Sequence, residues 1–249
     1  MGDTMTYCLG ILLSTGLILA SDSRSNAGVD NVAIVTKLAV IAVPGERIIT
    51  IQSQGNLATT QSVVTQMRQV AGKGEFGQDL YLAPTMFDVA TMVGAKLREV
   101  VERDTKYVTP YGDPSASFLV GGQIKGEPPR LFEIYSAGNF VEATARSPFL
   151  QIGEAKYGKP ILDRALRADS SLDHAAKLAL LSFDATMRSN LSVGMPIDFL
   201  SYVEGSLSAE NLITLDDQDP YWRDLRGRYA DGLERLVESL PAPQRDRSL

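Results

Sequence analysis

The chain has 249 residues, of which 44% are hydrophobic and 22% are charged, so it can bury a substantial core. Its 24 basic and 30 acidic side chains give a formal net charge of −6, which argues against nucleic acid or an anionic membrane as the main partner. The single cysteine excludes an internal disulfide and suits a reducing compartment. One cysteine and one histidine give no basis for a zinc site or a Ser-His-Asp enzyme. We therefore expect a cytoplasmic protein that needs no metal and no cofactor.

The hydrophobic pattern predicts strands first, then a pair of helices, then further strands and helices. The strands are expected at residues 6–13, 17–21, 38–43, 48–53, 116–122, 130–135, 139–144 and 197–204. The helices are expected at residues 56–71, from 85 onward, and at 157–167, 172–188 and 219–239. This order predicts one α+β domain over residues 1–249, a four-layer αββα sandwich of two antiparallel sheets between outer helix pairs. Residues 241–249 are expected to form a tail.

The apolar run over residues 5–20 superficially resembles a signal peptide. Asp3 precedes it instead of a basic residue, and Ser14-Thr15-Gly16 interrupts it. Two strands joined by a tight turn fit the pattern better. We expect no membrane association.

A glycine-rich stretch, Gly72-Lys73-Gly74-Glu75-Phe76-Gly77, formally matches the dinucleotide-binding pattern G-x-G-x-x-G. That pattern requires a strand before it and a helix after it. Here it follows a predicted helix, so we interpret it as a loop.

Thr6, Asp22 and Lys37 form the most informative set of side chains. A threonine hydroxyl is a weak nucleophile until a base removes its proton. If Thr6 began the chain, its own α-amine, with an ordinary pKa of about 8, could act as that base. A lysine ammonium held by an aspartate would lower the pKa of this amine and stabilise developing negative charge. The set therefore predicts an N-terminal threonine nucleophile, and metals play no part in it.

Gly55 lies where a predicted strand meets a predicted helix, in Ser53-Gln54-Gly55-Asn56. Backbone N–H groups at a helix start are unpaired and can face an anion. Gly55 could thus stabilise the oxyanion of a tetrahedral intermediate, or it could simply make the turn.

Five segments together resemble the bacterial proteasome-related Anbu family. They are residues 6–8, 20–31, 55–61, 152–164 and 189–194. The resemblance extends over about residues 5–240. It implies the N-terminal-nucleophile hydrolase fold of proteasome β-subunits, threonine-peptidase chemistry on peptide or protein substrates, and a homo-oligomeric ring or spiral.

The resemblance also implies site residues. Thr6, Asp22 and Lys37 fall at the terminal threonine, aspartate and lysine of the proteasome pattern. The resemblance therefore implies that these three residues are the catalytic set. Near the site, proteasome β-subunits usually carry Asp-x-x-Ser-Gly. Ser192 matches that serine, Ser189 replaces the acid, and Glu154 stands where a site serine is common.

The residues ahead of Thr6 admit two explanations. In the first, Met5 is the initiator, and an aminopeptidase removes it because the small Thr6 follows. In the second, residues 1–5 are a short propeptide that Thr6 cleaves. We favour the first, because the resemblance begins at Met5.

Two alternative functions remain open from the sequence. The chain could hydrolyse a non-peptide amide with the same terminal amine, or it could be a non-hydrolytic assembly subunit or latent precursor. The sequence does not show whether an ATP-driven unfoldase supplies its substrate.

Overall fold

The structure, a computed structural model, describes residues 6–26, 32–74 and 77–243. The strands in these ranges are, in chain order, β1 (Tyr7–Leu13), β2 (Gly16–Asp22), β3 (Arg24–Asn26), β4 (Val32–Ile34), β5 (Leu38–Val43), β6 (Arg47–Gly55), β7 (Ala116–Ile124), β8 (Arg130–Ile134), β9 (Phe140–Glu142), β10 (Phe149–Gly153), β11 (Ile197–Val203) and β12 (Leu212–Leu215). The helices are α1 (Leu57–Val70), α2 (Met86–Val108), α3 (Ala155–Ala165), α4 (Leu172–Ser189) and α5 (Pro220–Ser239).

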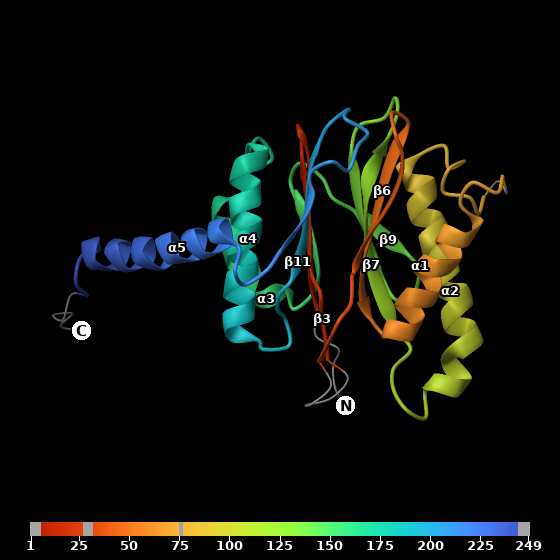
Figure 1. Ribbon diagram of the computed structural model, residues 1–249, viewed down its shortest axis with the longest axis horizontal. Coiled ribbons are helices and arrows are strands. Elements are labelled where there is room, and N and C mark those ends of the chain that lie inside the picture. Colours follow the sequence, from red (N-terminus) through yellow and green to blue (C-terminus); the bar gives the residue numbers. More distant parts are fainter. Residues whose placement is uncertain (1–5, 27–31, 75–76, 244–249) are drawn as a thin grey trace, which may run out of the picture.

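Two five-stranded antiparallel sheets face each other in the middle of the molecule (Figure 1). The first sheet has the strand order β10-β1-β2-β11-β12, and the second has the order β5-β6-β7-β8-β9. Helices α3 and α4 cover the outer face of the first sheet, and α1 and α2 cover that of the second. These layers confirm the predicted αββα sandwich.

The space between the sheets is filled by large apolar side chains, among them Leu19 of β2, Leu131 of β8 and Tyr202 of β11. Gly10 of β1 lets the two sheets approach closely, because a Cβ atom there would lie 2.7 Å from a methyl carbon of Leu131. All seven residues of β2 are buried, since the strand has the second sheet on one face and α4 on the other. A strand covered on both faces has an unbroken apolar sequence instead of alternation.

Each outer layer has its own core. Phe183 of α4 packs its ring 4.5 Å from that of Tyr7, so α4 is fixed over the first strand of the chain. On the other side, Val93 and Leu97 of α2 belong to the same buried cluster as Phe118 and Phe132 of the second sheet. The contact with Phe183 therefore holds Tyr7, the first residue of β1, firmly in place.

Four short strands were not predicted. They are β10 and β12, which form the two edges of the first sheet, and the separate hairpin β3–β4. Strand β12 is only four residues long and buries only Leu215, so it is too short to show the apolar alternation that indicates a strand. Edge strands of this kind form because a neighbouring strand offers hydrogen bonds, which a local pattern does not record. Most other boundaries agree with the prediction to within two residues.

The glycine-rich stretch follows α1, as predicted, and its described residues 72–74 and 77 lie in turns. The main-chain N–H groups of Gly72, Gly74 and Tyr81 all donate to the buried carboxylate of Asp79, over 2.8–3.0 Å. Burial acts to raise the pKa of Asp79, but these donors outweigh it and hold the pKa below its ordinary value. The loop thus encloses a carboxylate of the chain itself.

Helix α5 projects away from the four layers (Figure 1). In its first two turns, the fully buried Trp222 and an ion pair between Arg226 and Asp184 of α4, 2.6 Å long, attach it to the body. Beyond these turns, Leu236, Val237 and other apolar side chains are exposed by about half or more. No helix of the described residues is long and apolar enough to cross a membrane.

Candidate active site

Asp22 and Lys37 form a buried ion pair beside the first strand. Asp22 is the last residue of β2, and Lys37 immediately precedes β5, so the pair joins the two sheets. The Lys37 Nζ lies 2.8 Å from the Asp22 Oδ1, and the two side chains are 7% and 0% exposed. The Lys37 ammonium also donates to the carbonyl oxygen of Arg24. Both groups are therefore held in place and largely shielded from water.

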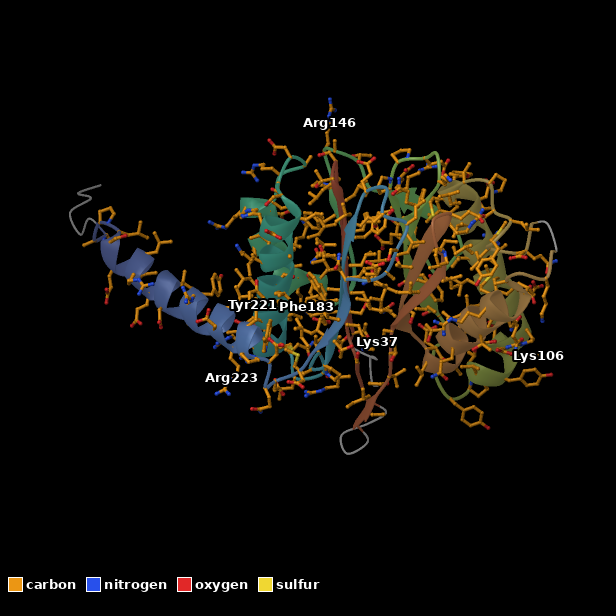
Figure 2. The ribbon with its side chains drawn as sticks, turned by 45° about the horizontal axis from the view of Figure 1, so that its top comes forward. Lys37, Lys106, Arg146, Phe183, Tyr221 and Arg223 are labelled. Atoms are coloured by element: carbon orange, nitrogen blue, oxygen red, sulfur yellow. The ribbon has the colours of Figure 1, made fainter. Side chains whose placement is uncertain are left out.

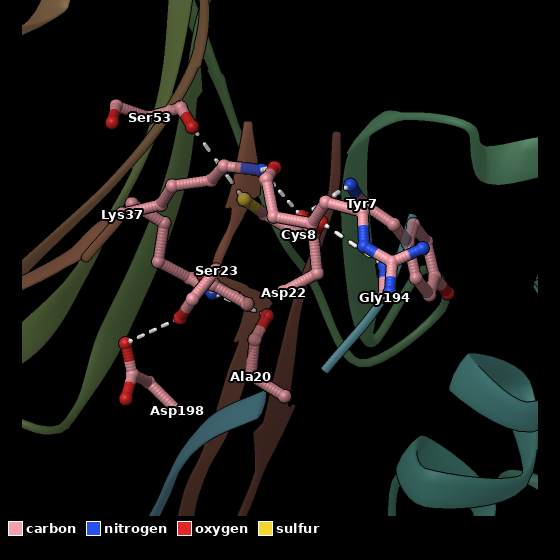
Figure 3. Close-up of polar contacts among 12 residues, drawn as sticks. Tyr7, Cys8, Ala20, Asp22, Ser23, Lys37, Ser53, Gly194 and Asp198 are labelled. Atoms are coloured by element: carbon pink, nitrogen blue, oxygen red, sulfur yellow. Dashed lines mark hydrogen bonds and ion pairs between the residues drawn. The ribbon is translucent and has the colours of Figure 1, made fainter. Parts of the chain in front are cut away.

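The Asp22 carboxylate receives two further main-chain hydrogen bonds. The N–H of Tyr7 donates to its Oδ1 over 3.0 Å, and the N–H of Gly194 donates to its Oδ2 over 3.4 Å (Figure 3). Burial raises the pKa of Asp22, while the Lys37 ammonium and these N–H groups oppose that rise. The bond from Tyr7 also fixes the peptide unit that follows Thr6.

Thr6 lies at the start of β1 and is only 2% exposed. Its carbonyl oxygen accepts a hydrogen bond from the N–H of Glu154 over 2.8 Å. Gly153 permits this approach, since its φ is +83° and a Cβ atom there would lie 1.8 Å from the Thr6 carbonyl oxygen. Backbone contacts on both sides thus position the threonine.

Gly55 ends β6, and Asn56 caps α1 by accepting a hydrogen bond from the N–H of Thr59 over 3.2 Å. The φ of Gly55 is +106°, which lies in the left-handed region that favours glycine. A Cβ atom would also lie 2.5 Å from the carbonyl oxygen of Ser115. Gly55 therefore brings main chain, without a side chain, to the start of α1.

The other three expected residues have different positions. The Glu154 carboxylate is near Lys156, with 3.3 Å between the Lys156 Nζ and the Glu154 Oε2. Ser189 is exposed at the end of α4, and Ser192 is half-buried, its N–H bonded to the Asn190 side chain over 2.9 Å. In the described residues, neither serine hydroxyl forms a hydrogen bond with Thr6, Asp22 or Lys37.

Sequence reasoning missed the main-chain groups around the pair. Tyr7, Arg24 and Gly194 each contribute a backbone atom, and a backbone atom leaves no signature in residue type. Gly194 is 172 positions from Asp22 in the chain, so only the fold brings them together. In the sequence, Gly194 could have been found through the resemblance of residues 189–194 to the Anbu family.

A cavity of about 290 Å³ opens at this place. Thr6, Lys37 and Gly55 all line it, and α1 forms one of its walls. In Figure 2, Lys37 lies between the strands of the two sheets, and the helices form the outer layers. The described part of the chain holds no cluster of three or more His, Cys, Asp or Glu side chains that would suit a metal ion.

The four layers are those of a proteasome-type subunit. The family model for the proteasome subunit matches residues 3–200. Comparison with curated protein sequences gave no match.

Solved structures give the particular branch. Anbu (ancestral beta-subunit) from Yersinia bercovieri is 44% identical, with a TM-score of 0.91, over 97% of this chain and 100% of that one. A helical assembly of the Anbu complex from Pseudomonas aeruginosa is 46% identical, with a TM-score of 0.91, over 96% and 98%. Anbu from Hyphomicrobium sp. strain MC1 is 43% identical, with a TM-score of 0.86, over 96% and 99%. The chain belongs to the Anbu branch of the proteasome subunit family.

Proposed function

We propose that the protein is an N-terminal threonine hydrolase that cleaves peptide bonds, with Thr6 as its nucleophile. The observation that carries this proposal is the buried Asp22–Lys37 pair, 2.8 Å long, whose lysine lines the same cavity as Thr6 and Gly55. A buried ion pair is costly to desolvate and is weak evidence for stability alone. We therefore explain the position of this pair beside Thr6 by a role in catalysis and not by a role in stability.

The reaction requires that Thr6 carries a free α-amine. This amine takes the proton of the Thr6 hydroxyl, directly or through a water molecule, and Oγ1 attacks the substrate carbonyl carbon. The Gly55 N–H and the Lys37 ammonium stabilise the oxyanion that forms. The protonated α-amine then gives its proton to the departing amine, and water hydrolyses the resulting ester. Asp22 accepts a hydrogen bond from the Lys37 ammonium and so orients it.

Glu154, Ser189 and Ser192 have supporting parts in this proposal. Glu154 holds the carbonyl group of Thr6 through its own N–H. Ser192 lies two residues before Gly194, whose N–H reaches Asp22, so the segment from Ser189 onward shapes that side of the site.

We also propose that copies of the chain assemble in the cytoplasm into a homo-oligomeric ring or spiral. The projecting helix α5 favours this, because a stripe of apolar side chains on an isolated helix is costly to leave in water. The stripe consists of Leu233, Leu236, Val237 and Leu240. The related Pseudomonas aeruginosa complex was solved as a helical assembly.

The decisive variant is Thr6→Ala, expressed from Met5 so that removal of one methionine exposes position 6. We expect it to abolish turnover, since the nucleophilic oxygen is gone, and to leave assembly unchanged in sedimentation. Thr6→Ser should keep part of the activity. Thr91→Ala, at an exposed position of α2, is the matched control and should keep all of it.

The substrates are a panel of fluorogenic peptides and a panel of small amides, and N-terminal sequencing verifies that Thr6 is exposed. Hydrolysis that persists in Thr6→Ala contradicts the mechanism. Turnover of small amides alone makes the protein an amidase. If the exposed Thr6 protein hydrolyses neither panel, it is an assembly subunit.

A further inference from the structure

Helix α1 turns one face to the cavity. The residues on this face recur at intervals of three and four, which is the helical repeat. They are Leu57, Thr60, Gln61, Val64, Thr65 and Arg68. At about 1.5 Å per residue, this face extends the cavity wall by roughly 16 Å from the end that lies next to Gly55. The cavity is therefore an elongated slot that begins at the reacting atoms.

The slot is positively charged in a protein that is negative overall. Lys37 and Arg68 line it, and no aspartate or glutamate does. The Lys37 charge is already paired with Asp22. Arg68 has no ion pair or hydrogen bond with any of the described residues. Other arginines, such as Arg130 and Arg226, pair with carboxylates over 2.6 Å. A slot lined by unpaired positive charge attracts anionic groups.

Arg68 lies in the last turn of α1, at the end of the slot away from Gly55. Side chains of an α-helix lean toward its N-terminus, which for α1 is the end beside Gly55. The slot between them is lined by short or apolar side chains, including Thr60 and Val64. A substrate side chain that enters beside Gly55 would first contact the short and apolar side chains of the slot and then the guanidinium of Arg68. A side chain with methylene groups followed by a carboxylate fits this sequence of contacts.

We propose that Arg68 is a specificity-determining residue that selects an acidic side chain on the substrate residue whose carbonyl Thr6 attacks, with glutamate preferred over aspartate. The longer side chain is preferred because Arg68 lies three helical turns from Leu57. This inference rests on the proposed function. A guanidinium and a carboxylate can form two parallel hydrogen bonds, so the geometry also favours arginine over lysine.

The test uses protein with Thr6 exposed and tetrapeptide epoxyketones that differ only in the residue next to the electrophile. The residues compared are Glu, Asp, Gln, Leu and Lys, and intact mass gives the rate of adduct formation on Thr6. Glu and Gln have the same shape, so their rate ratio isolates the charge. We expect a ratio of about five, typical of one partly exposed ion pair, and expect it to fall as salt is added.

Variants at position 68 test whether Arg68 causes the selectivity. Arg68→Ala should bring the Glu-to-Gln ratio to about one, Arg68→Lys should retain part of it, and Arg68→Glu should favour the Lys probe. A cation in the last turn of α1 also suits the helix dipole, and Arg68→Lys preserves that contribution. Lys106→Glu reverses a charge on the outer helix α2, far from Lys37 in Figure 2, and should leave the ratio unchanged.

Three outcomes would overturn the inference. If Thr6 reacts equally with the Glu and Gln probes, or if the ratio survives in Arg68→Ala, the selection by Arg68 is wrong and the threonine mechanism stands. If no probe modifies an exposed Thr6, the proposed function fails, and the inference fails with it.

Discussion

Replacing Lys37 with methionine tests whether the pair beside Thr6 is a coupled unit. The substitution keeps an unbranched side chain of similar length and removes the charge. Asp22 would then be a fully buried carboxylate whose remaining donors are the N–H groups of Tyr7 and Gly194. Activity should be lost, because the oxyanion and the terminal amine both lose their neighbouring cation.

The magnitude follows from the geometry. At 2.8 Å and an effective dielectric constant of about 20, the attraction between the two charges is about 6 kcal/mol. Relaxation and water entry offset part of this, so Lys37→Met should lower the free energy of unfolding by about 3 kcal/mol at pH 7. Asp22→Asn leaves the Lys37 ammonium only neutral acceptors, the amide oxygen and the Arg24 carbonyl, and should cost about 2 kcal/mol. In the double variant no charge is left unpaired, so its loss should be smaller than the sum by about 2 kcal/mol.

The pH dependence has a definite sign. Burial already raises the pKa of Asp22, and loss of Lys37 raises it further. A carboxyl group whose folded-state pKa lies above its unfolded-state pKa binds more protons when folded, so stability falls as the pH rises through the folded-state pKa. The deficit of Lys37→Met relative to the original protein should therefore be larger at pH 7 than at pH 4.

Urea unfolding, followed by the fluorescence of the single buried Trp222, measures all four proteins. Protein concentration must be constant, because self-association adds to apparent stability. Equal slopes with shifted midpoints would assign the changes to stability. If the two single effects simply add, or if the deficit of Lys37→Met relative to the original protein is no larger at pH 7 than at pH 4, the pair is not coupled and the reasoning is refuted.

Two further predictions concern groups outside the reaction. Asp79→Asn should destabilise the protein by about 2 kcal/mol at pH 7, because an amide offers one acceptor oxygen to the three N–H groups. The lowered pKa of Asp79 gives stability that is present above its ordinary pKa and is lost as the pH falls through the folded-state value. The urea midpoints of the original protein and of Asp79→Asn should therefore converge toward pH 3. A difference between the midpoints that stays constant with pH contradicts this prediction. Cys8 should resist a disulfide reagent at pH 8 until urea unfolds the chain, since burial raises its pKa to about 12, and rapid labelling of folded protein would disprove this burial.

The sequence by itself determined the layers and the order of the central elements. Strands β1, β2 and β6 carry long apolar runs, and α1 and α2 carry apolar faces at helical spacing, which are local signals. Thr6, Asp22 and Lys37 were identifiable because each supplies a side chain of a type that the chemistry needs. The edge strand β10 was not, because its hydrogen-bonding neighbour β1 lies far from it in the chain. The edge strand β12 pairs with the preceding strand β11, but it is only four residues long and buries one side chain, so it gives little local signal.

Only the tertiary structure decided how the site is held together. Asp22 ends a strand of one sheet and Lys37 immediately precedes a strand of the other, and the packing of those sheets sets the 2.8 Å between them. The donors from Tyr7 and Gly194 are backbone atoms, which residue type does not reveal. The position of Arg68 on the cavity wall also comes from the fold, which places its face of α1 along the cavity. Local pattern specifies the elements, whereas long-range packing specifies which groups meet, because contacts across sheets depend on register and layer spacing that no short segment contains.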